Sequence, residues 1–200
     1  MYGSLTAARP RELLRSVTSA RPRDLLGIYL NDHLAGAVAG SELARRCERN
    51  NAGTRYAEPL RGIANAIAED RRTLEHLMTA LGVAGNPAKQ LGALAAERIS
   101  RFKPNGRLTG YSPLSRIVEF DGLSAGINGK RALWLSLLAV ADHFASREET
   151  RGGASAEPRP AQYEALRTEE LRRLISRADE QLETIQRLRD QASVEAFVET

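Results

Sequence analysis

The chain has 200 residues, of which 42% are apolar, 27% are charged and only 5% are aromatic. That length is enough for one domain with its own core, and an apolar set made mainly of leucine, alanine and isoleucine favours packed helices over a β-sheet. No apolar run approaches the ~20 residues that a membrane span needs, and no N-terminal segment is typical of a signal peptide, so we expect no membrane partner and a cytoplasmic location.

The net charge of +4 would suit a nucleic-acid-binding protein, but the distribution of the charges argues against one. Almost all basic residues are arginine, and acidic residues are interleaved with them along the chain. This arginine bias, with abundant alanine, is typical of a GC-rich bacterial genome. We therefore expect a bacterial protein with no nucleic-acid partner. Cys47 is the only cysteine, which excludes an internal disulfide and a cysteine-based metal cage.

The first half of the chain predicts an N-terminal arm and two long helices. Residues 1–21 contain two Arg-Pro pairs and predict a loose arm. Residues 22–50 predict a helix, because Pro22 suits a first helical position and a turn signal follows Asn50. Residues 58–81 predict a second helix that Gly82 closes. Its apolar stripe alternates spacings of three and four residues and includes one carboxylate, Asp70.

The second half predicts a long connection and two further helices. Residues 83–111 predict a crossover connection that contains a short helix near residues 87–101. Residues 113–146 predict a helix whose apolar face comprises Phe120, Leu123, Ile127, Trp134, Leu135 and Leu138. A loop over residues 151–160 precedes a last helix over residues 161–191. We expect one bundle domain over residues 22–192 and a C-terminal tail over residues 193–200.

Two long helices, a long connection and two more long helices resemble the ferritin-like four-helix bundles. The segments LNDHLAGAVAG (30–40), AEDRRTLEHLM (68–78) and ISRADEQLETIQRL (175–188) resemble the ligand-bearing helices of that superfamily. The resemblance covers roughly residues 25–189. It implies an all-α, up-down four-helix bundle with one long crossover.

The resemblance also implies where metal ligands would lie, and most of those positions lack them. The di-iron centre of such bundles uses a Glu from each of two helices and a Glu-x-x-His pair from each of the other two. The corresponding positions hold Ala37, Asp70 with Thr73, and Ala178 with Gln181, and the chain contains no Glu-x-x-His. We therefore expect no conventional di-iron centre and no cofactor. The alternative is an altered iron or manganese site formed by His33, Asp70 and Glu119.

Several polar residues fall on or near the predicted inner faces of the helices. A buried charge is costly unless it is paired, so Asp70 requires a cation, and Arg131 or His33 is the expected partner. The group forms either a satisfied polar cluster or a pocket for a small anionic ligand. The ligand-binding candidates are His33, Asp70, Asn128, Arg131 and Gln181.

Glycines at helical spacing form a further pattern, comprising Gly36, Gly40, Gly122, Gly126 and Gly129. Because each interior helical glycine costs roughly 1 kcal/mol relative to alanine, they predict close helix packing within the subunit or across a dimer, or space for a ligand. Altogether, the sequence favours a homodimeric structural, interaction or small-ligand-binding protein rather than an enzyme. The alternative function is that of a metal-binding oxidoreductase or iron-handling protein.

Overall fold

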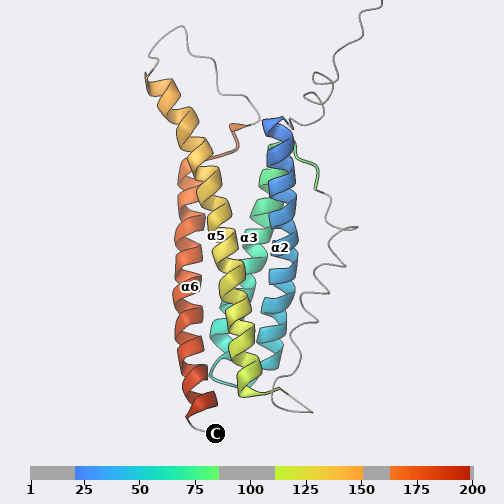
Figure 1. Cartoon of the computed structure of the whole chain (residues 1–200), viewed down its shortest axis with the longest axis vertical. Helices are drawn as coiled ribbons and strands as arrows, with labels where there is room; N and C mark the ends of the chain where they lie inside the picture. The colour runs from blue at the N-terminus through green and yellow to red at the C-terminus, as the bar shows by residue number, and fades with distance from the viewer. Residues whose placement is uncertain (1–20, 86–110, 151–162, 199–200) are drawn as a thin grey trace, which may run out of the picture.

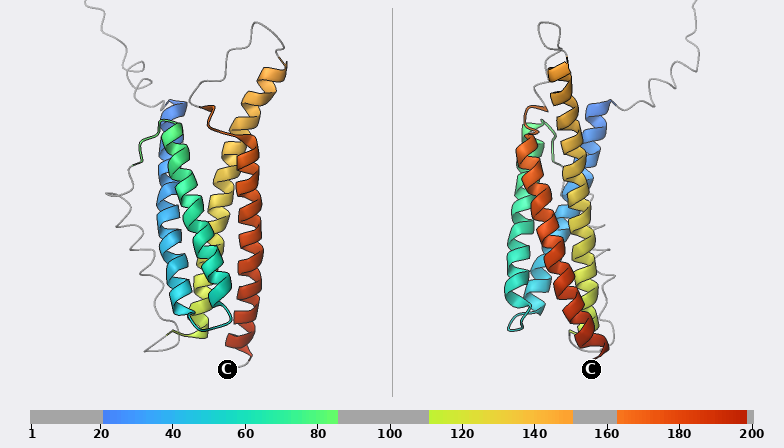
Figure 2. Two further views of the ribbon diagram at one scale, coloured as in Figure 1. Left: turned by 180° about the vertical axis from the view of Figure 1, so that it is seen from behind. Right: turned by 90° about the vertical axis from the view of Figure 1, so that its left-hand side faces the viewer.

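The computed structural model describes residues 21–85, 111–150 and 163–198, without the side chains of residues 148–150. Over these residues the chain forms four α-helices and no strand. The helices are α2 (Pro22–Asn50), α3 (Ala57–Ala80), α5 (Pro113–Thr150) and α6 (Thr168–Phe197), and they run along one common direction (Figures 1 and 2). The all-helical prediction is confirmed for this part of the chain. None of these helices is long and apolar enough to cross a membrane.

Helix α2 has the predicted bounds, and local interactions at both ends explain them. Pro22 is its first residue, and the carboxylate of Asp24 accepts hydrogen bonds from the backbone N and Nε of Arg21 at 3.3 and 3.1 Å. At the other end, Asn51 Nδ2 donates to the Cys47 carbonyl at 2.8 Å. Gly53 then adopts a φ of +77°, which the reversal into α3 requires and which other residues rarely adopt.

Helix α3 ends at Ala80, one residue before the predicted end, and Gly82 closes it as predicted. Gly82 has a φ of +66°, and the backbone N of Val83 donates to the Met78 carbonyl at 2.9 Å. This is the hydrogen-bond pattern of a glycine-terminated helix. Arg23 Nη2 donates to the Gly82 carbonyl at 3.4 Å, so the end of α3 lies beside the beginning of α2.

Helix α6 lies further along the chain than predicted. Residues 163–167 lie outside the α-helix, and Leu166 in this stretch is buried in the core. At its other end, the helix continues to Phe197 because Ala192 is buried and Glu195 binds Arg116. Residues 193–197 therefore belong to the bundle rather than to a tail. The expected short helix over 87–101, the loop over 151–160 and nearly all of the N-terminal arm lie outside the described residues.

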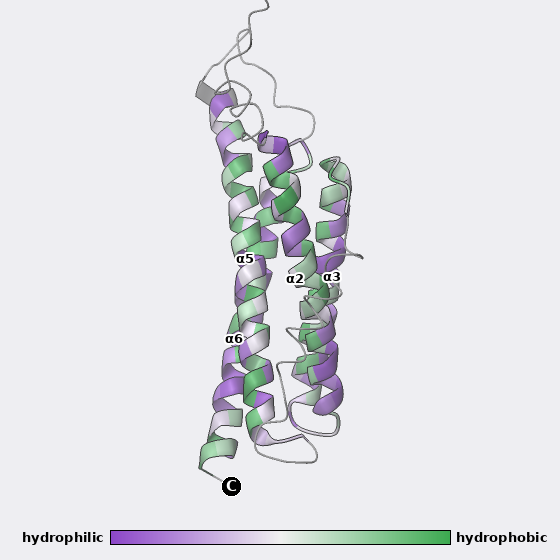
Figure 3. Cartoon of the chain, turned by 45° about the vertical axis from the view of Figure 1, so that its right-hand side comes forward, coloured by the Kyte–Doolittle hydropathy of each residue, from purple (hydrophilic) through white to green (hydrophobic). Residues whose placement is uncertain are grey.

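The core consists of two hydrophobic clusters stacked along the bundle. One surrounds Tyr56 and Phe120 near the α2–α3 turn, and the other surrounds Leu30 and Trp134 toward the opposite end. Figure 3 shows hydrophobic and hydrophilic residues alternating along each helix, as buried stripes on bundled helices require. On α3, Asp70 separates the two clusters, because Ile67 belongs to one and Leu74 to the other.

The glycines do not mediate close packing within this part of the chain. A Cβ atom added at Gly36, Gly40, Gly126 or Gly129 would meet nothing within 4 Å. The expectation that these residues allow two helices of one subunit to approach closely is therefore not met at these four positions. The other two explanations of these glycines, packing against a second copy of the chain and space for a ligand, stay predictions.

Candidate functional site

A polar cluster from three helices lies between the two hydrophobic clusters. It is centred on Asp70 of α3, whose exposed fraction is 2%. Lys130 of α5 donates from Nζ to Asp70 and to Gln181 Oε1, the latter at 2.5 Å. Arg177 of α6 donates to Asp70 Oδ1, and Gln181 Nε2 donates to Asp70 Oδ2 at 3.3 Å. Both oxygens of this buried carboxylate are therefore satisfied, as burial of a charge demands.

The pKa values of the two cations in this cluster, Lys130 and Arg177, shift in opposite directions. Burial lowers the pKa of Lys130, although the charge of Asp70 opposes this shift. Burial also acts against the charge of Arg177, but the carboxylates of Asp70 and Glu69 raise its pKa above the usual value. Arg177 reaches both carboxylates, with Nη1 3.1 Å from Glu69 Oε1. It thereby links α6 to α3, and we refer to Asp70, Lys130, Arg177 and Gln181 as the central cluster.

A second polar group lies near the α2–α3 turn around Glu119, whose exposed fraction is 5%. Arg46 Nε and Asn50 Nδ2 donate to its Oε1 at 2.9 and 3.1 Å, and the Tyr111 hydroxyl donates to its Oε2 at 3.0 Å. Burial and the charge of Glu119 raise the pKa of Tyr111. Both oxygens of Glu119 have partners within the bundle, so this group holds α2 against α5 and leaves Glu119 little capacity to bind a ligand.

The predicted ligand-binding residues do not all come together. Asp70 and Gln181 face inward, as predicted, and the structure also brings them into contact. Arg131 instead donates from Nε to Asp179 at 2.5 Å, and the side chains of this pair are 37% and 44% exposed. His33 packs against the ring of Tyr29 at 4.5 Å, and Asn128 is exposed and donates to the Ser124 carbonyl at 3.0 Å. The expected pairing of Asp70 with Arg131 or His33 is thus corrected to Lys130 and Arg177.

Lys130 takes the place expected for Arg131 because the apolar face of the third long helix was predicted out of phase with the observed one. The prediction placed Leu135 and Leu138 inward, but Leu135 is 40% exposed and Leu137 is buried. The observed stripe on α5 is Phe120, Leu123, Ile127, Lys130, Trp134 and Leu137, with Lys130 as its polar member. Adjacent helical residues point about 100° apart, so shifting this stripe by one residue exchanges Lys130 for Arg131. The alternating spacing of three and four residues around Lys130 was the signal that could have identified it.

The three residues proposed for an altered metal site lie in separate surroundings. Asp70 belongs to the central cluster, Glu119 is held by Arg46, Asn50 and Tyr111, and His33 lies against Tyr29. Among the residues that the structure describes, no three or more His, Cys, Asp or Glu side chains are grouped so that they could hold a metal ion. The predicted arrangement of His33, Asp70 and Glu119 is therefore not present.

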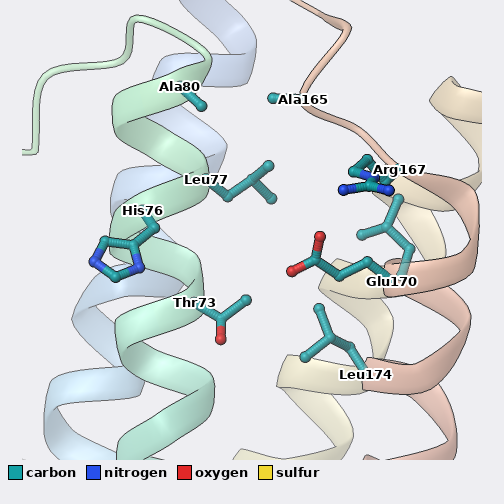
Figure 4. A pocket seen from close by; sticks show the side chains of 9 residues that line it. Thr73, His76, Leu77, Ala80, Ala165, Arg167, Glu170 and Leu174 are labelled. Carbon is teal, nitrogen blue, oxygen red and sulfur yellow. The ribbon is translucent and has the colours of Figure 1, made fainter.

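A pocket that the sequence did not reveal lies between α3 and α6, on the Ala80 side of Asp70 along α3. Its volume is about 230 Å³, and it is partly open to solvent. Thr73, His76 and Leu77 of α3 line it opposite Glu170 and Leu174 of α6 and Arg167, which precedes α6. In Figure 4, Thr73 and Leu77 point toward α6, whereas the ring of His76 points away from it. The remaining lining residues are Ala80, Ala165 and Leu171. We call this space the α3–α6 pocket.

The α3–α6 pocket combines an apolar wall with charged groups at its edge. Leu171 and Leu174 also belong to the hydrophobic core, and Leu77 packs against it. Arg167 and Glu170 are exposed, and neither has an ion-pair partner within the described part of the chain. Unlike the buried polar groups around Asp70 and Glu119, the α3–α6 pocket has both empty volume and charged side chains without an ion-pair partner among the described residues.

No protein-family model, curated protein or solved structure matches the chain.

Proposed function

We propose that the chain is a ferritin-like four-helix bundle without a conventional di-iron centre, and that it binds a small zwitterionic molecule with an apolar side chain in the α3–α6 pocket. The order of the helices supports the first part. The end of α3 lies beside the start of α2, whereas Tyr111, which precedes α5, binds Asn51 at the end of α2. Bundles with one long crossover have this arrangement. A cytoplasmic location in a bacterium belongs to the same proposal.

The observation that carries the binding proposal is the composition of the pocket wall. Leu77, Leu171 and Leu174 offer an apolar surface that continues the core. An apolar side chain that covers this surface gains roughly 25 cal/mol for each Å² removed from water. A pocket of about 230 Å³ accommodates a small side chain rather than a long acyl chain or a ring system. The apolar wall therefore selects the body of the ligand.

The charged residues at the edge of the α3–α6 pocket select the charged groups of the ligand. Arg167, which immediately precedes α6, and Glu170, in the first turn of α6, both line the pocket (Figure 4). A carboxylate alone would be attracted by Arg167 but repelled by Glu170, and an amine alone would meet the opposite problem. A molecule with both charges satisfies both residues. An apolar amino acid is the simplest molecule with these properties.

Isothermal titration with L-leucine, 4-methylpentanoate and 3-methylbutylamine tests the proposal, because the last two each lack one charge of leucine. We expect leucine to bind most tightly. Arg167→Gln should weaken leucine binding, whereas Arg172→Gln, at an exposed position of α6 outside the pocket, should not. Ala80→Phe should fill the pocket and abolish binding, with Thr79→Phe as the adjacent control. Equal affinity for the three compounds, or no binding of any, would overturn the assignment.

We also propose that the protein is a homodimer that uses the outer face of α2 and α5. Leu25 and Ile28 of α2 and Leu135 of α5 are large exposed apolar residues. Ile28 and Leu135 directly precede Tyr29 and Ser136, whose hydroxyl groups hydrogen-bond at 3.1 Å between the two helices. Exposed large apolar residues favour association, and the uncontacted glycines on α2 and α5 leave room for a partner helix.

A further inference from the structure

A second cavity lies at the opposite end of the bundle, beside the turn between α2 and α3. Its volume is about 360 Å³. The charged residues that line it are Arg45, Glu48 and Arg49 of α2 and Arg61 of α3, and the remaining lining is formed by Ala52, Gly53 and Ala57. We infer that this cavity binds the phosphate group of a small molecule. The inference is independent of the ligand proposed for the α3–α6 pocket.

The charge balance of the lining is the first step of the argument. Three guanidinium groups face one carboxylate, that of Glu48. Arg45 Nη1 lies 3.1 Å from Glu48 Oε2, and Arg61 Nε lies 3.5 Å from Glu48 Oε1. Glu48 is thus already shared between two arginines. Arg49 has no ion-pair partner among the residues that the structure describes. The lining therefore keeps a positive excess that a bound anion would neutralise.

The positions of the arginines indicate that this excess is unfavourable in the empty cavity. Arg45 and Arg49 are four residues apart on α2, so they are neighbours on one face of the helix. Like charges at this spacing repel each other and destabilise a helix. Arg61 approaches from α3, where Glu58 also binds it at 2.8 Å. An anion between the two helices would replace repulsion on α2 by attraction from both helices.

Phosphate chemistry fits this lining better than a single carboxylate does. A guanidinium group presents paired N–H donors that match two oxygens of a phosphate. A phosphate carries up to two negative charges and enough oxygens to accept hydrogen bonds from more than one arginine. The small residues of the turn leave the arginines accessible, and the positive end of the α3 dipole adds to the field. The cavity is also larger than a phosphate group, so it leaves space for the rest of a phosphorylated molecule.

The test is isothermal titration with inorganic phosphate and pyrophosphate at constant ionic strength adjusted with sodium chloride. We expect pyrophosphate to bind more tightly than phosphate, and Arg49→Gln to weaken pyrophosphate binding by about tenfold. Arg172→Gln, which removes an exposed arginine at the other end of the bundle, is the matched control and should leave binding unchanged. Absence of pyrophosphate binding at ~10 mM, or equal effects of the two substitutions, would overturn the inference.

A second arm distinguishes the source of the phosphate. Vesicles of phosphatidylglycerol and of phosphatidylcholine are sedimented with the protein, with and without pyrophosphate. Sedimentation with phosphatidylglycerol alone that pyrophosphate reverses would assign the site to a lipid head group. Pyrophosphate binding without sedimentation would assign it to a soluble phosphorylated molecule. Sedimentation that neither pyrophosphate nor Arg49→Gln affects would show that this cavity is not the anion site.

Discussion

At the scale of single residues, Asp70 determines whether the centre of the bundle is stable. Removing one partner from a buried ion pair typically costs about 3–5 kcal/mol, because the other charge remains buried. We therefore expect Asp70→Asn, which leaves Lys130 and Arg177 without their shared carboxylate, to lower the free energy of unfolding by that amount. Asp179→Asn, which breaks the half-exposed pair with Arg131, should cost less than about 1 kcal/mol. Urea denaturation measures both, and similar losses would show that the central cluster contributes no more than a surface pair.

Cys47 makes the free energy of unfolding depend on pH in the alkaline range. The residue is fully buried, and burial together with the charge of Glu119 raises the pKa of its thiol. The native protein then keeps a proton that the unfolded chain loses above about pH 8.5. Because the unfolded state binds fewer protons, the free energy of unfolding falls as the pH rises, by at most about 1.4 kcal/mol per pH unit for this group.

The variant Cys47→Ala isolates that contribution. Tyr111, whose pKa burial also raises, and Lys130, whose pKa burial lowers, are retained in both proteins. We expect the decline between pH 8 and pH 10 to be shallower in the variant when both are denatured with urea over this range. Parallel curves would mean that the Cys47 thiol ionises equally in the folded and unfolded states.

At the scale of the helices, the last turns of α6 act as a clamp rather than as a tail. Glu195 accepts hydrogen bonds from Arg116 of α5 at 2.8 Å and from the Tyr56 hydroxyl at 2.9 Å. Arg116 also lies 4.5 Å from the centre of the Tyr56 ring. Glu195→Gln removes the charge from these hydrogen bonds, and we expect a loss of about 1–3 kcal/mol.

For a chain of this length, that loss corresponds to a fall in melting temperature of roughly 2–4 °C per kcal/mol, which calorimetry measures. The control is Glu183→Gln, at an exposed position of α6 for which the structure describes no ion pair. A melting temperature unchanged by Glu195→Gln would mean that the end of α6 adds nothing to the bundle.

At the scale of the whole molecule, the exposed apolar face of α2 and α5 predicts the oligomeric state. Light scattering should give the mass of a dimer, twice the 21.9 kDa of the chain, at micromolar concentration. Leu135→Glu places a charge on this proposed interface and should yield monomers, whereas Leu114→Glu, at a similarly exposed position near the start of α5, should not. A monomer mass for the unsubstituted protein at every concentration would contradict the proposal.

The sequence by itself determined the elements of this protein. Apolar stripes and local stop signals are properties of one helix, so Pro22, the turn after Asn50 and the glycine at position 82 were sufficient to bound α2 and α3 closely. The inward position of Asp70 and Gln181 followed from the same periodicity. The ferritin-like resemblance and the function remain proposals.

Tertiary structure decided which of the remaining side chains meet. The choice between Lys130 and Arg131 depends on how far α5 is rotated about its axis, and a drift of one residue along a helix of 38 residues reverses that choice. The extent of α6 depends on burial of Leu166 and Ala192 by other helices. Both cavities lie between two helices, and their volumes depend on how those helices pack. Periodicity within one segment specifies which face is apolar, but only the packing of several segments specifies what that face touches.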